Sequence, residues 1–415
     1  MMEEKKLTPQ LRFPEFKNAG EWDGDSLINI AKFRRGSFPQ PYGLPEWYDD
    51  ENGMPFIQVY DVDDNFRLKQ TTKRKISELA AAQSVFIEKG TVIITIQGSI
   101  GRVAITQYDA YIDRTLLIFQ EFYNNIDKTF FAYILFLLFE IEKLKAPGGI
   151  IKTITKEVLS DFVVSFPKVQ EQQKIASCLS SLDELIAAHK EKLDALKDHK
   201  KGLLQNLFPQ EGENVPKVRF PEFEEDGEWV EKKLGEIGEP LMCKRIFKDQ
   251  TTPNPENGIP FYKIGTFGRD ADAYIPEALY NEFKDKYNFP NIGDILISAS
   301  GTIGRLVIYD GSPAYYQDSN IVWLGNDESQ VTNQFLYYCY SIVNWQTSDG
   351  GVIKRLYNSD LKAISINFPK NEKEQQKIVS CLSALDELIM AQAEKIEQLK
   401  MHKKGLMQGL FPSAV

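Results

Sequence analysis

A long internal repeat constrains the fold of this chain more than any other feature of its sequence. The segment from Glu171 to Pro209 matches the segment from Glu374 to Pro412 at a constant offset of 203 residues, and 28 of the 39 positions are identical. Both copies open with Glu-Gln-Gln-Lys-Ile and close with Leu-Phe-Pro. The fold therefore has to accommodate two equivalent elements.

Each copy follows a longer segment that repeats only at scattered landmarks. These are Arg-Phe-Pro-Glu-Phe at 12–16 and 219–223, Gly-Glu-Trp at 20–22 and 227–229, Pro-Phe at 55–56 and 260–261, Gly-x-Ile-Gly-Arg at 98–102 and 301–305, Gly-Gly-x-Ile-Lys at 148–152 and 350–354, and Phe-Pro at 166–167 and 368–369. Residues between the landmarks differ freely. This pattern indicates a shared scaffold with two different surfaces, as in a protein that holds two readers at a fixed distance.

The two repeated segments have the apolar periodicity of long helices. Apolar residues alternate in steps of four and three over four to five heptads, which predicts coiled-coil seams. The predicted seam residues are Ile175, Leu179, Leu182, Ile186, His189, Leu193, Leu196 and Leu203 in the first helix, and Ile378, Leu382, Leu385, Ile389, Gln392, Ile396, Leu399 and Leu406 in the second. Flanking prolines at 167, 209, 369 and 412 bound the helices, and about 37 residues make a rod of roughly 55 Å.

Each helix is the simplest partner for the other; the alternative is that each packs separately on its own domain. His189 and Gln392 lie near the middle of the seams, where a polar residue specifies register and orientation. Lys200 and Lys403 also interrupt the seams. We therefore interpret the polar positions as devices for specific pairing.

The variable segments mix strand and helix patterns. Buried strands are predicted at 91–96, 116–119, 294–298 and 321–324, and apolar helices at 130–145 and 333–345. This mixture predicts an α+β fold. We expect two domains at 1–168 and 210–371, with the long helices at 169–209 and 372–415.

Composition excludes several classes of protein. The longest apolar run, Phe130 to Phe139, is too short to cross a bilayer, and the charged N-terminus lacks the apolar core of a secretory signal, so we expect a cytoplasmic protein. The chain has only three histidines and four cysteines, and no C-x-x-C spacing, which predicts no metal centre and no disulfide framework. A histidine-based catalytic site would have to be built on the long helices.

The net charge of −10 weighs against nucleic-acid binding, but its distribution matters more than its sum. Residues 210–372 carry 16 basic and 25 acidic side chains and hold most of the excess. Basic residues cluster in predicted loops of both halves, which favours a polyanion over solvated surface. The DNA-binding candidates, including polar groups suited to base edges, are Arg34, Arg35, Lys69, Lys73, Arg74, Lys75, Gln97, Ser99, Arg102, Lys152, Lys244, Arg245, Lys248, Ser300, Thr302, Arg305, Lys354 and Arg355, with Gln317, Ser319 and Asn320 beside them.

The glycine landmarks at 98–101 and 301–304 have two interpretations. They lack the Lys-Ser or Lys-Thr of a Walker loop and the third glycine of a dinucleotide fingerprint. A tight turn between two strands is the first interpretation. The second is a turn whose backbone amides, with Arg102 or Arg305, contact a nucleic-acid phosphate.

Taken in order, the landmarks resemble the specificity (S) subunit of type I restriction-modification systems over essentially the whole chain. The repeated segments, from Glu-Gln-Gln-Lys-Ile-x-Ser-Cys-Leu to Lys-Lys-Gly-Leu-x-Gln-x-Leu-Phe-Pro, carry the resemblance most specifically. It implies two target recognition domains that each read one half of a bipartite double-stranded DNA site, and an antiparallel helical spacer that docks two methyltransferase subunits. The candidate docking residues on the exposed helix faces are Gln172, Glu184 and Lys192, with their counterparts Gln375, Glu387 and Lys395. The resemblance also implies restriction subunits in the full complex.

The sequence lacks motifs for chemistry of its own. It contains no Asn-Pro-Pro-Tyr or Asp-Pro-Pro-Tyr methylation motif, no S-adenosylmethionine fingerprint and no nucleotide-binding loop. We therefore predict no catalytic residue here, with S-adenosylmethionine, ATP and Mg²⁺ on partner subunits. Two alternatives stay open: a coiled-coil scaffold that binds other proteins, and a self-contained nuclease or methyltransferase.

Overall fold

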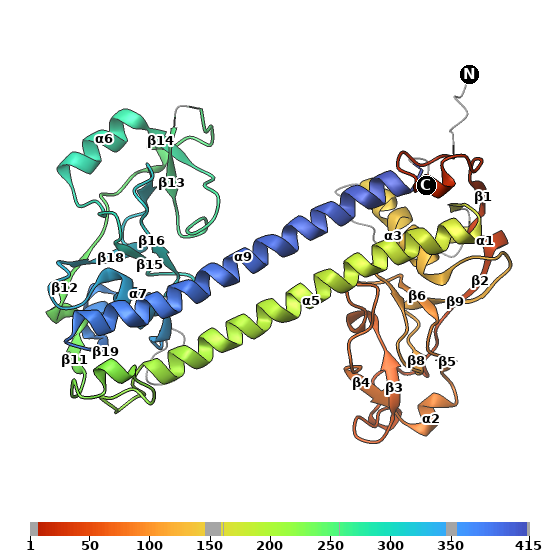
Figure 1. Ribbon diagram of the computed structural model, residues 1–415, viewed down its shortest axis with the longest axis horizontal. Helices are drawn as coiled ribbons and strands as arrows, with labels where there is room; N and C mark the ends of the chain where they lie inside the picture. The colour runs from red at the N-terminus through yellow and green to blue at the C-terminus, as the bar shows by residue number, and fades with distance from the viewer. Residues whose placement is uncertain (1–6, 146–158, 161, 257, 346–354, 413–415) are drawn as a thin grey trace. The chain divides into compact units, whose positions relative to one another are not determined.

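The computed structural model describes residues 7–145, 159–160, 162–256, 258–345 and 355–412 (Figure 1). Internal contacts divide the chain into two units. Unit 1 contains Met1–Lys192 and Gln392–Val415, and unit 2 contains Leu193–Ala391. The division passes through the middle of both long helices, so each unit combines one globular region with part of each helix.

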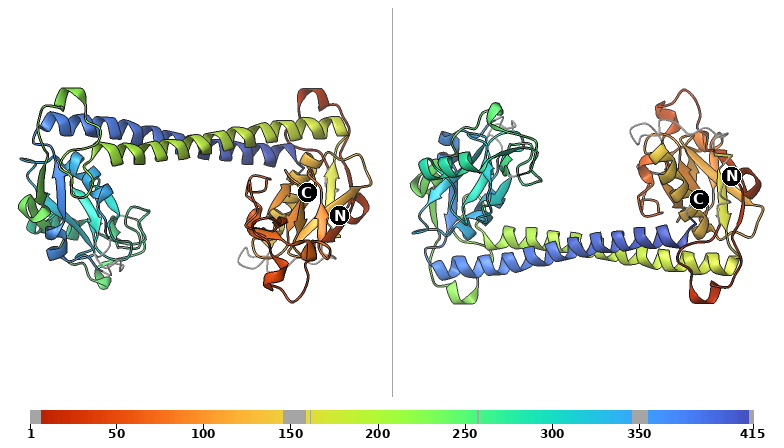
Figure 2. Two further views of the ribbon diagram at one scale, coloured as in Figure 1. Left: turned by 90° about the horizontal axis from the view of Figure 1, so that it is seen from below. Right: turned by 90° about the horizontal axis from the view of Figure 1, so that it is seen from above.

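The long helices are α5 (Val169–Leu207) and α9 (Glu372–Leu410), each of 39 residues. In unit 1, Asp183 and His189 of α5 contact Lys403 and Gln392 of α9, so the numbering falls along one helix as it rises along the other. In unit 2, Lys200 of α5 pairs with Asp386 of α9 in the same sense. The two helices therefore pack antiparallel within each unit, side by side in the views of Figures 1 and 2.

The predicted seam residues are all buried or half-buried. Those nearest the start of each helix also enter the globular cores: Ile175 and Leu179 lie in the core of unit 1, and Ile378 and Leu382 in the core of unit 2. The helices therefore pair with each other and pack on the domains, which combines the two arrangements that the sequence left open.

Unit 1 is built on two four-stranded sheets, one with strand order β2-β9-β6-β7 and one with order β4-β3-β8-β5, and on a short β1–β10 pair. The strands are β1 (Asp23–Ser26), β2 (Ala31–Arg35), β3 (Met54–Ile57), β4 (Arg74–Ile76), β5 (Val85–Ile87), β6 (Val92–Thr95), β7 (Val103–Ile105), β8 (Ala110–Ile112), β9 (Leu116–Phe122) and β10 (Val163–Phe166). The helices are α1 (Leu27–Ile30), α2 (Glu78–Ala81) and α3 (Lys128–Lys145). Neighbouring strands are antiparallel except β3 and β8, which are parallel.

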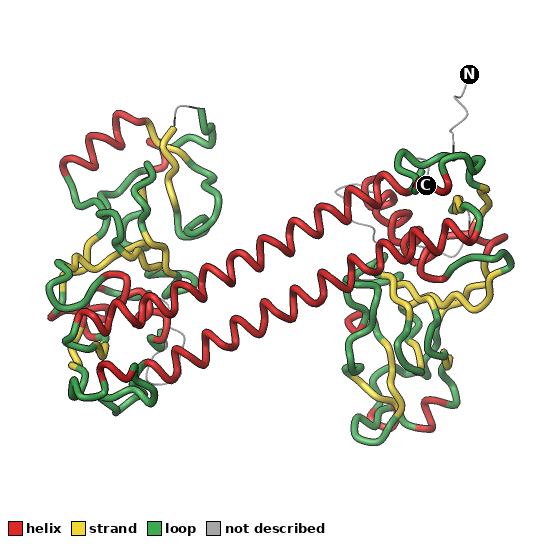
Figure 3. Tube along the Cα trace, in the orientation of Figure 1, coloured by secondary structure: helices red, strands yellow, loops and turns green. Residues whose placement is uncertain are grey.

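Unit 2 follows the same plan, with strand orders β12-β18-β15-β16 and β14-β13-β17 and a β11–β19 pair. Its strands are β11 (Val230–Lys233), β12 (Gly238–Leu241), β13 (Gly258–Tyr262), β14 (Tyr274–Pro276), β15 (Ile295–Ser298), β16 (Leu306–Ile308), β17 (Tyr315–Tyr316), β18 (Ile321–Asn326) and β19 (Ser365–Phe368), and its helices are α6 (Glu277–Lys286), α7 (Asn333–Ile342) and α8 (Asn358–Ala363). Figure 3 shows the mixture of helix and strand in each unit. The α+β prediction is confirmed, as are the predicted strands and helices; α7 ends three residues earlier than predicted.

A three-ring aromatic cluster joins each globular region to the end of a long helix. In unit 1, Phe411 stacks on Phe130 of α3 with ring centroids 5.4 Å apart, and Trp22 packs edge-on against Phe411. In unit 2, Phe208 and Phe335 stack at 5.3 Å, again beside a tryptophan, Trp229. These contacts explain why Gly-Glu-Trp and Leu-Phe-Pro recur as landmarks, because each unit needs the end of one long helix to complete its core.

The landmark Arg-Phe-Pro-Glu-Phe holds each globular region to the start of a long helix. Arg12 forms a bidentate ion pair with Glu171 of α5, and Arg219 forms the same pair with Glu374 of α9, both with closest N–O distances of 2.7 Å. Both guanidiniums are almost fully buried. The repeated Arg and Glu are therefore structural, since a bidentate pair fixes both distance and angle.

Candidate nucleic-acid interface

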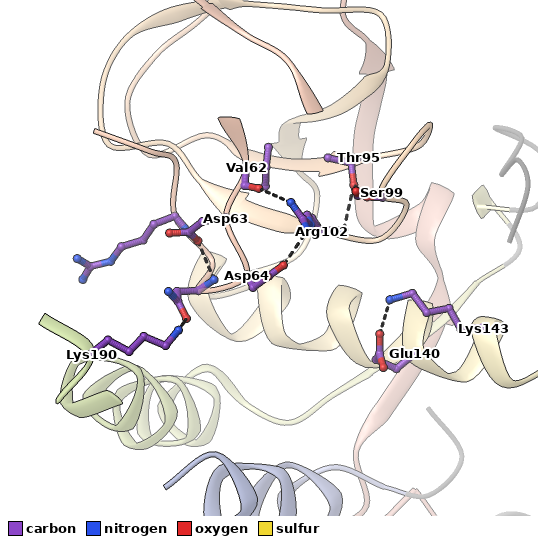
Figure 4. A network of polar contacts seen from close by, with 11 residues as sticks. Val62, Asp63, Asp64, Thr95, Ser99, Arg102, Glu140, Lys143 and Lys190 are labelled. Carbon is purple, nitrogen blue, oxygen red and sulfur yellow. Dashed lines mark hydrogen bonds and ion pairs between the residues drawn. The ribbon is translucent and has the colours of Figure 1, made fainter. Parts of the chain in front are cut away.

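The glycine landmarks form tight turns between β6 and β7 and between β15 and β16, as the first interpretation predicts. The last two amides of each landmark are used inside the hairpin. Gly101 N donates to Thr95 O and Arg102 N to Thr95 Oγ1, and Gly304 N and Arg305 N donate in the same way to Ser298 O and Ser298 Oγ. The guanidiniums also bind protein carbonyls, because Arg102 donates to Val62 O and Arg305 to Phe267 O. Both arginines anchor a neighbouring loop onto the hairpin, and Figure 4 shows the contacts of Arg102 with Val62 and Asp64.

A hollow of about 380 Å³ lies beside the first of these turns. Asp63 and Asp64 line this hollow. Asp64 forms an ion pair with Arg102, with 3.1 Å between Asp64 Oδ1 and Arg102 Nε. Arg102 and Lys143 also line the hollow, but each is already paired with a carboxylate, Arg102 with Asp64 and Lys143 with Glu140, so the hollow does not support the second interpretation. The candidates Gln97, Ser99 and Thr302 are exposed on the two turns.

Four of the basic candidates in the first half of the chain lie on strands rather than in the loops that we predicted. Arg34 and Arg35 end β2, and Arg74 and Lys75 begin β4, each strand at the edge of its sheet. An edge strand can carry exposed charged side chains. A short sequence segment of this kind therefore looks the same as a loop. Lys69 and Lys73 do lie in an exposed loop.

In unit 1, polar side chains gather around the β8–β9 loop, residues 113–115. Asp113 is buried and accepts a hydrogen bond from Tyr42 Oη at 2.9 Å. Gln58 Nε2 donates to Tyr42 Oη, and Tyr60 Oη donates to Gln58 Oε1. We call Tyr42, Gln58, Tyr60 and Asp113 the tyrosine–amide network.

The two tyrosines of the tyrosine–amide network remain protonated at neutral pH and can donate hydrogen bonds. Burial, followed by the charge of Asp113, raises the pKa of Tyr42, and burial raises the pKa of Tyr60 to about 12. Cations lie against both rings: Lys73 Nζ is 5.0 Å from the Tyr60 centroid, and the Arg114 guanidinium is 5.5 Å from that of Tyr42. Of these residues, sequence reasoning identified only Lys73.

In unit 2, polar residues gather around the equivalent β17–β18 loop, residues 317–320. Arg245 pairs with Asp318 at 3.0 Å, and the Arg355 guanidinium donates to Ser319 O at 3.1 Å. Ser300 Oγ donates to Asn320 Oδ1 at 2.9 Å. The structure therefore brings together three DNA-binding candidates from distant segments, Arg245, Ser300 and Arg355, with Ser319 and Asn320. Lys244, which precedes Arg245 in the sequence, places its Nζ 5.1 Å from the centroid of the Tyr287 ring, and Lys248 is exposed.

The two loops occupy the same backbone frame but carry different chemistry. Asp113 N donates to Ile57 O at 3.0 Å, and Gln317 N donates to Tyr262 O at 2.9 Å. Matching the units through these bonds places Gln317 where unit 1 has Asp113, Asp318 where it has Arg114, and Lys263 where it has Gln58. Constant backbone with divergent polar side chains is what two readers of different sequences require.

Two DNA-binding candidates, Lys152 and Lys354, lie outside the described residues together with their Gly-Gly landmarks. Among the described residues, no group of three or more His, Cys, Asp or Glu side chains is placed to hold a metal ion. No helix in the described ranges combines the length and the apolarity needed to span a membrane.

Two of the residues that we expected on the exposed, docking faces of the long helices are buried instead. Gln172 and Gln375, which the sequence suggests as docking residues, are 1% exposed. Gln172 Nε2 donates to Pro167 O at 2.8 Å, and Gln375 Nε2 donates to Pro369 O at 2.9 Å. These glutamines satisfy backbone groups at the domain–helix junctions and cannot meet a partner, so this part of the expectation was wrong.

Polar groups in the helix seams are paired. Gln392 Nε2 donates to His189 Nδ1 at 2.6 Å and to His189 O at 2.9 Å. Lys403 Nζ binds both carboxylate oxygens of Asp183, which also accepts from Tyr133 Oη at 2.7 Å. Burial, opposed by Asp183, lowers the pKa of Lys403. In unit 2, Lys200, Asp386 and Tyr338 form the equivalent triad.

Comparisons with known proteins agree with this architecture. A family model described as the type I restriction modification DNA specificity domain matches residues 44–198 and 226–401. A putative type I restriction enzyme specificity subunit of Haemophilus influenzae is 54% identical over 156 residues, which span 38% of this chain and 40% of that protein. The type I restriction enzyme MjaVIII specificity subunit of Methanocaldococcus jannaschii is 22% identical over 427 residues, with 98% of this chain and 94% of that protein covered.

Solved structures share the fold. The crystal structure of the S subunit of a type I restriction-modification system from M. genitalium aligns with a TM-score of 0.60 at 16% identity, over 98% of this chain and 100% of that chain. A second chain, from a structure of complex assembly and conformational transition in the type I R-M system, aligns with a TM-score of 0.55 at 17% identity, over 95% and 98% of the two chains.

Proposed function

The chain belongs to the family of type I restriction-modification DNA specificity domains and is a specificity subunit with DNA-recognition domains, and from this premise we propose that each unit reads one half of a bipartite DNA site. The observation that carries the proposal is the contrast between the β8–β9 and β17–β18 loops. Their backbone frames match, while their polar side chains differ in charge and hydrogen-bonding capacity. Different half-sites require different base contacts on a common frame.

The proposal includes two methyltransferase subunits, one for each long helix. Leu185 and Leu388 occupy equivalent positions in the repeat and are 45% and 57% exposed. One exposed leucine needs no explanation. Its retention in both copies, where 11 of 39 positions differ, supports two equal docking surfaces, which also include Glu184, Lys192, Glu387 and Lys395.

In this proposal, the chemistry belongs to the partners. The methyltransferase subunits bring S-adenosylmethionine, and restriction subunits bring ATP and Mg²⁺. Much of the phosphate contact also belongs to the partners, because residues 210–372 are acidic and phosphate binding requires cations. This chain then makes the base contacts that specify the sequence.

Reconstitution tests the proposal. The chain with its methyltransferase subunit should methylate a bipartite sequence, while either protein alone should not. Binding by the complex should weaken steeply with salt, since phosphate contacts release counterions. Robust methylation by this chain alone would contradict the proposal. Protein binding without sequence-selective DNA binding by the complex would favour the coiled-coil scaffold, which the acidic net charge also suits.

A further inference from the structure

The tyrosine–amide network holds the side-chain amide of Gln58 by both its nitrogen and its oxygen. Gln58 Nε2 donates to Tyr42 Oη, and Gln58 Oε1 accepts from Tyr60 Oη. Tyr42 is fixed in turn by its 2.9 Å hydrogen bond to Asp113, a carboxylate that is 1% exposed and also accepts from Thr115. The side-chain amide is therefore oriented before any ligand arrives.

A second buried carboxylate fixes the backbone of the same residue. Asp61 is fully buried and accepts from Gln58 N at 2.8 Å and from Lys73 N at 2.9 Å. One carboxylate thus holds both Gln58 and the loop that carries Lys73. Burying a carboxylate is costly, and here the two buried carboxylates organise a surface group rather than a core.

The surroundings of the amide suit DNA. Tyr42 and Tyr60 are 41% and 37% exposed and Gln58 is half-buried, so the two rings reach the surface on either side of the amide. Lys73 lies against the Tyr60 ring and Arg114 against the Tyr42 ring, which places a cation on each side of Gln58. Flanking cations can contact phosphates while the amide between them contacts a base edge.

The hydrogen-bonding capacity left on Gln58 identifies the base. An amide has two N–H donors and an oxygen with two lone pairs. The tyrosines use one of each, which leaves one donor and one acceptor. This donor–acceptor pair complements N7 and the N6 amino group of adenine in the major groove.

We propose that Gln58 is a specificity-determining residue of unit 1 that reads an adenine of the first half-site through N7 and N6. This inference rests on the proposed function and deepens it. Unit 2 carries Lys263 at the equivalent position, so it should make a different base contact there. Gln58 acts only on the first half-site.

The test measures how tightly the complex of this chain with methyltransferase binds DNA that carries its bipartite site. S-adenosylmethionine is left out so that methylation does not contribute. Each adenine of the first half-site is replaced in turn by 7-deazaadenine, which lacks the N7 acceptor. The wild-type complex should lose about ten-fold in affinity at one adenine, within the range of a bidentate contact. Gln58→Ala should weaken binding to the natural site by a similar factor and should be insensitive to 7-deazaadenine at that position.

Gln83→Ala is the matched control, because Gln83 is an exposed glutamine of the same unit outside the tyrosine–amide network. It should bind like the wild type and keep its sensitivity to 7-deazaadenine. Unchanged reading of the other bases of the first half-site by Gln58→Ala shows that unit 1 of the variant is folded. Should that variant not fold, Gln58→Glu takes its place, because it keeps the shape of the side chain but has no amide donor for N7, and it should likewise be insensitive to 7-deazaadenine.

Two outcomes overturn the inference. One is a wild-type complex that is insensitive to 7-deazaadenine throughout the first half-site, or whose first half-site contains no adenine. The other is a Gln58→Ala complex that remains as sensitive as the wild type. A wild-type complex that selects no bipartite sequence contradicts the proposed function instead, so the two failures are distinguishable.

Discussion

At the residue scale, the repeated landmarks connect each globular region to a long helix through ion pairs that differ in burial and therefore in strength. The Arg219–Glu374 pair is 8% and 0% exposed at its side chains, whereas the Lys377–Glu222 pair of the same junction is about half exposed. Removing one partner from a buried pair leaves an uncompensated charge, and an exposed pair contributes little. The two pairs therefore predict very different mutational costs.

We predict that Arg219→Ala lowers the free energy of unfolding of unit 2 by about 3 kcal/mol or more. Lys377→Ala, the matched control, should cost less than about 1 kcal/mol. Chemical denaturation followed by tryptophan fluorescence measures both. Equal small effects would mean that the buried pair does not hold the junction.

Local patterns in the sequence predict the helices and strands but not the tyrosine–amide network. The seam of α5 and α9 and strands such as β6 follow from periodicity, because neighbouring residues determine them. Tyr42, Gln58 and Asp113 meet only because β3 pairs with β8 in parallel. Gln172 was misinterpreted for the same reason, since its backbone partners become apparent only in the folded chain.

At the scale of elements, ion pairs explain the direction of the long helices. The antiparallel arrangement sets Asp183 against Lys403 and Lys200 against Asp386. A parallel pairing in register would set the two aspartates together and the two lysines together, because both occur at the repeat offset of 203. Like charges in a buried seam are strongly unfavourable, so the charge pattern selects the antiparallel pairing.

We predict that Lys403→Ala destabilises the packing of α9 on α3 and α5 in unit 1 by about 3 kcal/mol, because Asp183 stays buried without its cation. Hydrogen exchange should accelerate in α3 and remain unchanged in α7 of unit 2. Lys404→Ala, an exposed neighbour, is the control and should change stability by less than about 0.5 kcal/mol. Equal exchange in both variants would show that the triad contributes nothing to the pairing.

At the scale of the whole molecule, both long helices continue from one unit into the other. We therefore propose that their length sets the gap between the half-sites. His189 contacts Gln392 within unit 1, and these two residues are the middle residues of the heptads 186–192 and 389–395. Deleting both heptads removes matched stretches and preserves the phase of the seam.

The double heptad deletion should shorten the helices by about 10 Å, and the gap in the methylated sequence should contract by up to about three base pairs at roughly 3.4 Å each. The half-sites themselves should stay the same. Deleting four residues instead breaks the phase of the seam and should damage assembly. An unchanged gap in an active complex would mean that the helices do not measure DNA.

The most direct measurement of the central claim, that two independent readers share one chain, is the methylated sequence after exchange of one reader. Residues 1–168 are replaced by the equivalent domain of a relative that keeps the arginine and tryptophan landmarks, since Arg12 and Trp22 contact α5 and the end of α9. Single-molecule methylome sequencing then compares cells with the original and exchanged chains. We predict a new first half-site beside an unchanged second half-site. A change in both half-sites, or in neither, would contradict the claim.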